Sequence, residues 1–302
     1  MIETMEKNKR IPLLIGLLVL LVIIAYATGT FDAAPSTVDV PAIEIEAGGI
    51  DEIEVNSPEF SIRVQKMNGI WQVLEPIAWM ADSVSINSFA RNLADLKLES
   101  VVSTNPERYS RYGVDSTASV VTVTSGEDVQ KLTISSKGSD FMTTYIRLED
   151  DERVFIARPR ISIPTDADRW RDKMIAMIPS QILTAVNVTT PDNTFSLSKG
   201  DSGWRLSLDG RETAADSAAV DRYLRNFNRF RADGFISTVP EEDSVEYVVE
   251  LVLSTGESLT FAFTELDTEL ALDYSGEPRA TYKLFSSRKA TLIPDPTIFS
   301  TE

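Results

Sequence analysis

Apolar and polar residues alternate in the same pattern at two places along the chain. The segment from Val55 to Val73 recurs from Val188 to Leu206 at a constant offset of 133 residues (204 − 71), which aligns Trp71 with Trp204. Each copy alternates about a short polar turn, as the two strands of a β-hairpin do. The pattern therefore predicts two equivalent hairpins, each with a tryptophan just past its turn.

The similarity continues beyond the hairpins. After one added residue the offset becomes 134 (215 − 81), so that Ala81-Asp82-Ser83 matches Ala215-Asp216-Ser217. Self-similarity at a fixed period indicates repeated structural units. We therefore predict two tandem homologous lobes, over residues 50–165 and 182–302.

A helical pattern follows the hairpin in each copy. Residues 82–97 and 216–231 carry apolar side chains at helical spacing, and an aspartate or serine at positions 82–83 and 216–217 is a suitable N-cap. The apolar positions are Ile86, Phe89, Ala90, Leu93 and Leu96 in the first copy, and Val220, Tyr223, Leu224, Phe227 and Phe230 in the second. Each stripe is wide enough to cover one face of a sheet.

Each copy then returns to strands. The expected strands are 120–125, 132–135, 144–148 and 153–157 in the first copy, and 248–253, 259–263, 280–285 and 290–293 in the second. The expected fold class is therefore α+β, with an antiparallel sheet and one packed helix in each lobe. Between the lobes, Trp170, Met174, Ile175 and Ile178 have helical spacing, which predicts a connecting helix over residues 166–181.

A long apolar run precedes the repeats. Residues 11–31 contain no charged side chain and reach the length of about 20 residues that a transmembrane helix needs. Lys7, Lys9 and Arg10 precede this run, so the positive-inside rule places residues 1–10 in the cytoplasm. We expect a single-pass anchor in the cytoplasmic membrane.

Everything after the anchor would then lie outside the cytoplasm. Residues 32–49, with Pro35 and Pro41, are expected to form a tether to an ectodomain that is periplasmic or extracellular. The alternative is a cleaved signal peptide, since Ala25-Tyr26-Ala27 has the small-x-small form of a cleavage site. Both interpretations export the repeats.

Composition limits the chemistry. The chain has a formal net charge of −17 and contains neither cysteine nor histidine. The acidic surplus disfavours nucleic acid as a partner, because it would repel the phosphate backbone. The missing residues remove disulfides, a cysteine nucleophile, the usual zinc ligands and the commonest general base. We accordingly predict no catalytic residues, no metal site and no cofactor.

Several short motifs have simpler structural explanations. Gly200-Asp201-Ser202-Gly203 resembles the loop around a serine nucleophile, but it occupies a predicted hairpin turn and has no histidine to accept a proton. The pairs Ser196/Lys199 and Ser286/Lys289 have Ser-x-x-Lys spacing, which joins two side chains on a helix but separates them on a strand. We expect both pairs in or at the ends of strands.

The acidic and tryptophan candidates are also expected to be structural. Glu149-Asp150-Asp151-Glu152, and Asp166 with Asp168, could bind calcium or act in glycoside hydrolysis, but neither has the spacing of a calcium-binding loop. Solvated turns explain them better. Trp71 and Trp204 could stack on a sugar, yet residues that recur in both copies fit core packing better.

One segment stands out as a candidate binding site. Arg108, Tyr109, Arg111 and Tyr112 concentrate two arginines and two tyrosines in an otherwise acidic chain. These residue types are enriched at the energetic centres of protein interfaces, although an ordinary connection before a strand would look similar. The second copy has no equivalent, so we predict that this segment contacts a partner.

The order of the motifs resembles a known family, the bacterial proteins catalogued as domain of unknown function 4340. The matching features, after the apolar N-terminal run, are the Trp71 hairpin, Ala81-Asp82-Ser83, Val101-Val102-Ser103, Tyr112-Gly113-Val114-Asp115, Tyr145-Ile146-Arg147 and Trp170-Arg171-Asp172-Lys173. The second copy departs from the pattern, because Pro240–Glu246 replaces the tyrosine-glycine run. The resemblance carries over no catalytic residues.

The resemblance implies an extracytoplasmic, membrane-tethered accessory protein of the kind encoded beside gliding-type ABC transporter subunits. We therefore expect a non-enzymatic accessory or scaffold protein whose partners are inner-membrane or envelope proteins, among them ABC transporter subunits. Two alternatives stay open. One is an envelope ligand-binding protein that uses a cleft between its lobes, and the other is a carboxylate-dependent envelope hydrolase.

Overall fold

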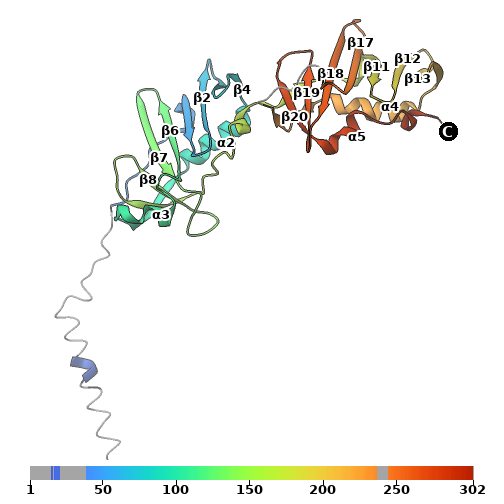
Figure 1. The fold of residues 1–302 in the computed structure, drawn as a ribbon. Helices are drawn as coiled ribbons and strands as arrows, with labels where there is room; N and C mark the ends of the chain where they lie inside the picture. The colour runs from blue at the N-terminus through green and yellow to red at the C-terminus, as the bar shows by residue number, and fades with distance from the viewer. Residues whose placement is uncertain (1–14, 16, 21–38, 237–243, 302) are drawn as a thin grey trace, which may run out of the picture. The chain divides into compact units, whose positions relative to one another are not determined.

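The computed structural model describes residues 15, 17–20, 39–236 and 244–301 (Figure 1). The expected cytoplasmic segment 1–10, most of the expected anchor and residues 32–38 of the expected tether lie outside these ranges. Among the described residues, no helix combines the length and the apolar character that crossing a bilayer requires.

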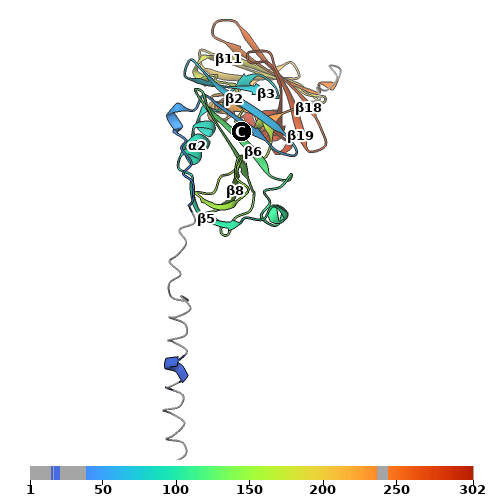
Figure 2. The same ribbon diagram turned by 90° about the vertical axis from the view of Figure 1, so that its left-hand side faces the viewer.

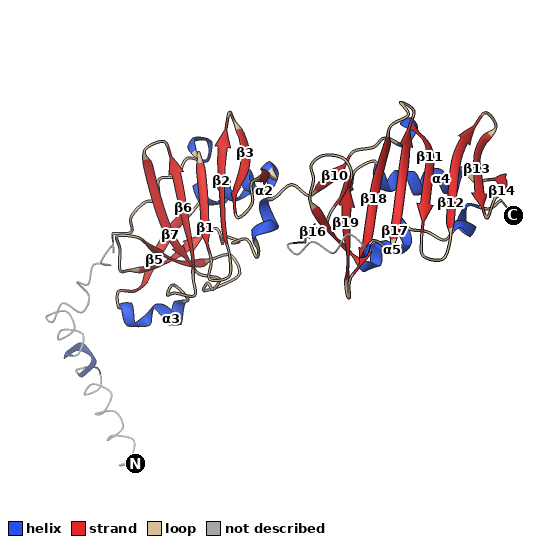
Figure 3. Ribbon diagram, turned by 45° about the horizontal axis from the view of Figure 1, so that its top comes forward, coloured by secondary structure: helices blue, strands red, loops and turns tan. Residues whose placement is uncertain are grey.

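The chain divides into two compact units. The first comprises Met1–Ile50, Val55–Pro58 and Phe89–Ile163, and the second comprises Asp51–Glu54, Glu59–Ser88 and Pro164–Glu302. Strands dominate the described residues, as the red arrows of Figure 3 show.

The first antiparallel sheet has nine strands in the order β4-β3-β2-β1-β6-β7-β8-β9-β5. The strands are β1 Glu52–Asn56, β2 Ser61–Met67, β3 Ile70–Glu75, β4 Trp79–Met80, β5 Lys97–Ser103, β6 Ser119–Ser125, β7 Asp128–Ile134, β8 Thr144–Leu148 and β9 Val154–Arg158. Inward-facing positions on β1, β2 and β3 alternate with exposed or half-buried ones, which is the pattern of strands with one face on the core.

The second antiparallel sheet also has nine strands, in the order β14-β13-β12-β11-β17-β18-β19-β20-β16. They are β11 Leu183–Thr189, β12 Thr194–Gly200, β13 Gly203–Leu208, β14 Arg211–Ala214, β16 Gly234–Phe235, β17 Tyr247–Leu253, β18 Ser258–Glu265, β19 Glu269–Tyr274 and β20 Thr281–Phe285. The paired strands β18 and β19 run side by side in both Figure 1 and Figure 2.

The two sheets share one topology. Four strands come first, a helix follows, the next strand that joins the sheet lies at its far edge, and four more strands complete the sheet. The internal repeat in the sequence therefore corresponds to a repeated strand order.

A helix occurs at the same place in each copy. α2 spans Ser83–Ala94 and α4 spans Ser217–Leu224. As expected, an aspartate caps each one. Asp82 Oδ1 accepts from the backbone N–H of Val84 at 3.2 Å, and Asp216 Oδ1 accepts from that of Ala218 at 2.9 Å. These bonds satisfy donors that would otherwise lack an intrahelical partner.

The second helix is shorter than the expected 216–231. A 3₁₀ turn over Arg225–Phe227 follows α4, and the chain then becomes extended in β15, Phe230–Arg231. The Asn226 side chain donates to the Tyr223 carbonyl at 2.8 Å, which occupies an acceptor at the end of the helix. Phe230 is buried although its backbone is extended. The helical spacing of apolar residues therefore continued past the end of the helix and did not predict where it ends.

The predicted connecting helix over 166–181 is wrong. This stretch contains a 3₁₀ helix at Ala167–Trp170, the strand β10 at Met174–Ala176 and part of a second 3₁₀ helix at Ser180–Ile182. β10 pairs antiparallel with β15 in a two-stranded sheet. Tertiary pairing thus overrides a spacing that also suits a helix.

The predicted strand over 290–293 is wrong as well. The chain there forms a short helix, α5, at Lys289–Leu292, and the partners of β20 are β19 and β16. A four-residue segment has too few positions for its apolar period to separate helix from strand.

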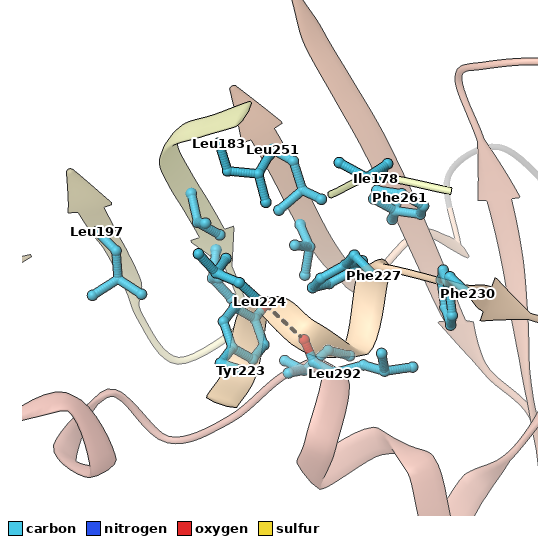
Figure 4. Packing of buried hydrophobic residues seen from close by; sticks show 14 of the residues in the cluster. Ile178, Leu183, Leu197, Tyr223, Leu224, Phe227, Phe230, Leu251, Phe261 and Leu292 are labelled. Carbon is cyan, nitrogen blue, oxygen red and sulfur yellow. Dashed lines mark hydrogen bonds between the residues drawn. The ribbon is translucent and has the colours of Figure 1, made fainter. Parts of the chain in front are cut away.

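The core of the second unit is built around the end of α4 (Figure 4). Leu224, Phe227, Phe230 and Phe261 have no exposed side-chain surface. The ring centroid of Phe227 lies 5.3 Å from that of Phe261 and 5.6 Å from that of Phe230. The Tyr223 hydroxyl donates to the Leu292 carbonyl at 3.0 Å, the dashed line in Figure 4, and so connects α4 to α5.

Two buried tyrosines should make the fold sensitive to alkali. Burial raises the pKa of Tyr223 well above its ordinary value, and it raises the pKa of Tyr282 to about 12. Above about pH 10, tyrosines of the unfolded chain release protons that these two side chains retain in the folded state. The unfolded state then binds fewer protons, so the free energy of unfolding should fall as the pH rises further.

Tyr223→Phe tests this expectation. Urea unfolding midpoints measured from pH 8 to 11 should fall less steeply for the variant than for the parent above about pH 10. At pH 8 the variant should be less stable by about 1 kcal/mol, because the Leu292 carbonyl loses its donor. Equal slopes for the two proteins would contradict the assignment.

Candidate functional site

The arginine-tyrosine segment forms a helical turn that is fixed at both ends. A 3₁₀ helix at Pro106–Arg108 leads into α3 at Tyr109–Tyr112. Asn105 Oδ1 accepts from the backbone N–H of Glu107 at 2.9 Å and caps the start. Gly113 ends the turn in the left-handed conformation, with φ 65°.

Gly113 is required for two reasons. An L-residue with this φ is strained, and a Cβ would lie 2.7 Å from Ser135 Oγ. The glycine therefore allows α3 to approach the end of β7 closely. This close approach fixes the C-terminal end of the segment on the first unit.

The two tyrosines hold the segment in place. The Tyr109 hydroxyl donates to the backbone carbonyl of Glu152 at 2.9 Å, and the Tyr112 hydroxyl donates to that of Val102 at 3.1 Å. Both side chains are half-buried. Their hydroxyls are thus occupied by the first unit itself, and their role is to position α3.

β8 supplies the surface under the tyrosine rings, and α3 lies beside it in Figure 1. The Tyr145 ring meets the Tyr112 ring edge-on, with centroids 5.0 Å apart. The guanidinium carbon of Arg147 lies 5.0 Å from the centroid of the Tyr109 ring. Sequence reasoning did not assign these two contacts, although alternation along the predicted strand 144–148 places positions 145 and 147 on one face.

The two arginines of the segment lie at the surface. Arg108 and Arg111 are exposed, and within the described part of the chain neither forms an ion pair. The closest aromatic neighbour of Arg111 is the ring of Tyr112, at 5.8 Å. Arg108 lines an open pocket of about 430 Å³ together with residues 101–105. The structure therefore holds two solvated cations, three positions apart, on a fixed support.

The acidic run beside the site is a hairpin turn, as expected. Glu149–Glu152 connects β8 to β9, and Arg153 binds Asp151 through both carboxylate oxygens. This hydrogen bond lowers the pKa of Asp151. The Arg153 guanidinium also donates to the Asp39 carbonyl at 2.8 Å, which fixes the incoming chain beside the turn that Tyr109 contacts.

The other carboxylate candidate, Asp166 with Asp168, lies near the 3₁₀ helix at 167–170. Asp168 accepts from Arg171 at 2.9 Å, and Asp166 accepts from Thr165. Within the described ranges, no group of three or more acidic side chains is arranged to hold a metal ion.

Two of the three serine motifs lie where expected, but the prediction for Ser286 and Lys289 is wrong, because a 3₁₀ helix at Ser286–Arg288 leads directly into α5. Gly200 and Gly203 pair across the turn between β12 and β13, and Ser196 and Lys199 both lie on β12. Ser286 follows the end of β20, whereas Lys289 begins α5 and binds Tyr247 at 2.7 Å and Glu265. The hydrogen bond with Glu265 raises the pKa of Lys289, which is opposite to the shift a lysine base needs.

The two tryptophans are part of the packing. Trp71 is 2% exposed and Trp204 is 7% exposed. The Trp71 Nε1–H donates to Asn87 Oδ1 at 2.8 Å, which links its hairpin to α2. Their ring faces are not available to a sugar.

Comparison with known proteins gives one family. A family model described as Domain of unknown function (DUF4340) matches residues 71–250, more than half of the chain. Neither the curated proteins nor the solved structures include a match.

Proposed function

From the premise that the chain belongs to the family described as domain of unknown function DUF4340, we propose that it is a non-enzymatic accessory or scaffold protein of the cell envelope. It is anchored in the cytoplasmic membrane by residues 11–31, with both repeat lobes outside, and it serves an ABC-type transport complex. The apolar run and its preceding basic residues support the anchor and its orientation. The absence of histidine and cysteine supports a binding role over a catalytic one.

The observation that carries this proposal is the exposure of Arg108 and Arg111 on a rigid support. A docking surface gains affinity when its contact groups are already in place, because less conformational freedom is lost on binding. α3 is fixed by the capped 3₁₀ helix that precedes it, by Gly113 and by two tyrosine hydroxyls. Two free guanidinium groups at the end of such a support suit an acidic or carbonyl-rich surface of a membrane-embedded partner.

Charge reversal tests the docking surface. The tagged full chain, purified in mild detergent from cells that express its native neighbours, should carry a membrane protein with it. Arg108→Glu combined with Arg111→Glu should reduce the recovered partner at least about tenfold, since truncating one central interface arginine typically costs more than about 1 kcal/mol.

The chain offers a matched control at the end of α4. Arg222 and Arg225 are also exposed and three positions apart. Arg222→Glu with Arg225→Glu makes the same change in net charge at a helix of the second copy, and it should leave recovery unchanged. Equal recovery with both double variants would show that α3 is only a connection.

A further inference from the structure

The loop between β7 and β8 presents an apolar tip to solvent. Phe141 is 92% exposed and Met142 is 58% exposed. Large apolar side chains on a soluble surface are individually ordinary, but an almost fully exposed phenylalanine next to an exposed methionine costs solubility without adding to a core.

The loop holds this tip outward through a dense set of hydrogen bonds. Thr143 Oγ1 accepts from the backbone N–H groups of Ser139 at 3.0 Å and Asp140 at 3.1 Å, and Asp140 Oδ1 accepts from that of Met142 at 2.7 Å. A Cβ at Gly138 would collide with the Thr143 carbonyl, so the two arms of the loop are in direct contact. The exposure of Phe141 is therefore fixed by the loop geometry.

Basic side chains flank the tip. Lys137 and Arg160 are both exposed, and Arg160 donates to the Ser136 carbonyl at 2.5 Å. The nearby Asp140 carboxylate lies 3.3 Å from Arg158, which also binds Glu99 at 2.9 Å, so two acidic groups share this one cation. Lys137 also approaches α3, because its Cδ lies 3.4 Å from where a Gly113 Cβ would be. An apolar tip with cations around it therefore adjoins the docking segment.

The second copy lacks this feature. By strand order, its corresponding loop joins β18 to β19 and has only three residues, Leu266-Asp267-Thr268, of which Leu266 is 36% exposed. The repeat fold thus forms with a short connection at this place, and the long loop that carries Phe141 and Met142 is specific to the first copy.

We propose that Phe141 and Met142 insert into the anionic phospholipid surface of the membrane in which the chain is anchored, with Lys137 and Arg160 on the headgroups. Aromatic and apolar side chains flanked by cations favour the boundary between headgroups and acyl chains. The inference rests on the proposed anchor. Asp39, whose carbonyl accepts from Arg153, is eight residues beyond Phe31 (39 − 31), so the part of the tether between the two spans at most about 28 Å.

Because the tether is short, even a weak affinity of the loop for lipid is sufficient to keep it inserted. Anchoring holds the loop at a high effective concentration at the lipid surface, so the loop needs little affinity of its own. The acidic remainder of the chain repels anionic lipid, whereas the cations of the loop are attracted to it.

The lack of cysteine permits a direct test. Phe141→Cys creates a unique thiol for an environment-sensitive fluorophore in the full chain, reconstituted without other proteins into phosphatidylglycerol-rich vesicles. We expect quenching by nitroxide-labelled lipids and shielding from aqueous iodide. The control is Val129→Cys, at a position 61% exposed in the same unit, whose label should stay accessible to iodide.

The proposed insertion should also depend on charge, both of the loop and of the lipid. The double variant Lys137→Glu with Arg160→Glu should reduce the fraction of label that nitroxide lipids quench, and replacing phosphatidylglycerol with phosphatidylcholine should do the same. We expect about a fivefold reduction for each cation that no longer contacts an anionic headgroup. Equal iodide access at positions 141 and 129 in incorporated chains would overturn the proposal, while leaving partner docking at α3 intact. Shielding of position 141 only when neighbouring proteins are added would also overturn it, in favour of a protein contact. A chain that fails to incorporate would refute the anchor and this proposal together.

Discussion

Replacing Phe227 with alanine should lower the free energy of unfolding by about 3–5 kcal/mol. The side chain has no exposed surface, and its ring contacts those of Tyr223, Phe230 and Phe261 at centroid distances of 5.6, 5.6 and 5.3 Å. Alanine would remove these contacts and leave a cavity that three rigid rings cannot easily fill. The loss combines the transfer free energy of the ring with the cost of the cavity.

The repeat supplies a second test of the same idea. Leu93 occupies the equivalent position of the first copy (227 − 134) and is also fully buried, so Leu93→Ala should cost about 2–5 kcal/mol. Phe285→Ala is the control, because Phe285 is 55% exposed and its removal should change stability by less than about 0.5 kcal/mol. Urea midpoints followed by tryptophan fluorescence measure all three. Similar midpoints for Phe227→Ala and Phe285→Ala would contradict the described core.

Replacing Arg171 with alanine should cost about 2–4 kcal/mol, mainly through the loss of stacking. Within the second unit, its guanidinium carbon lies 3.4 Å from the ring centroid of Phe235 and 4.9 Å from that of Trp79. The side chain is 6% exposed, and its ion pair with Asp168 joins a carboxylate that is 31% exposed. That carboxylate can be hydrated when the arginine is removed, so the ion pair contributes less to the effect than the stacking on the two rings.

Two further variants separate the causes. Arg171→Lys keeps the charge but loses the planar group that stacks on the rings, so its stability should fall between those of the parent and the alanine variant. Arg169→Ala removes an exposed arginine two positions away and should be nearly neutral. Thermal unfolding followed by tryptophan fluorescence measures the order of stability of the parent and the three variants. A lysine variant as stable as the parent would show that charge, and not stacking, is the source of the effect.

The repeat made much of the fold predictable. Two copies of a pattern give two independent indications of the same element, so the hairpins at Trp71 and Trp204 and both helix starts were placed correctly. The predicted pair 144–148 and 153–157 is confirmed by β8 and β9. In these segments the alternation or helical period extends over enough residues to exclude other choices.

Segments without a repeated pattern were harder to assign. Trp170, Ile175 and Ile178 are all buried, as their helical spacing suggested, but the backbone that carries them is not an α-helix. The extended conformation of β10 is determined by its pairing with β15, which lies more than fifty residues later in the chain. The residues around β10 alone do not predict that pairing. The helix α5 was missed because its four residues are compatible with either period.

The sequence identified the residues of the candidate site but did not show that its tyrosines and arginines have different roles. Composition selected Arg108, Tyr109, Arg111 and Tyr112 together. The structure uses the tyrosine hydroxyls internally and leaves the guanidinium groups to solvent. The sequence could not separate these roles, because the acceptors of Tyr109 and Tyr112 are backbone carbonyls, which carry no residue-specific signal.

Those backbone acceptors have an evolutionary consequence. The carbonyls that hold α3 belong to Val102 and Glu152, and any other L-amino acid at either position would present the same oxygen. Side chains there are free to diverge without moving the helical turn, whereas loss of either tyrosine hydroxyl would release one of its ends. Selection that preserves this turn should therefore act on Tyr109, Tyr112 and Gly113, while the side chains at positions 102 and 152 are free to change.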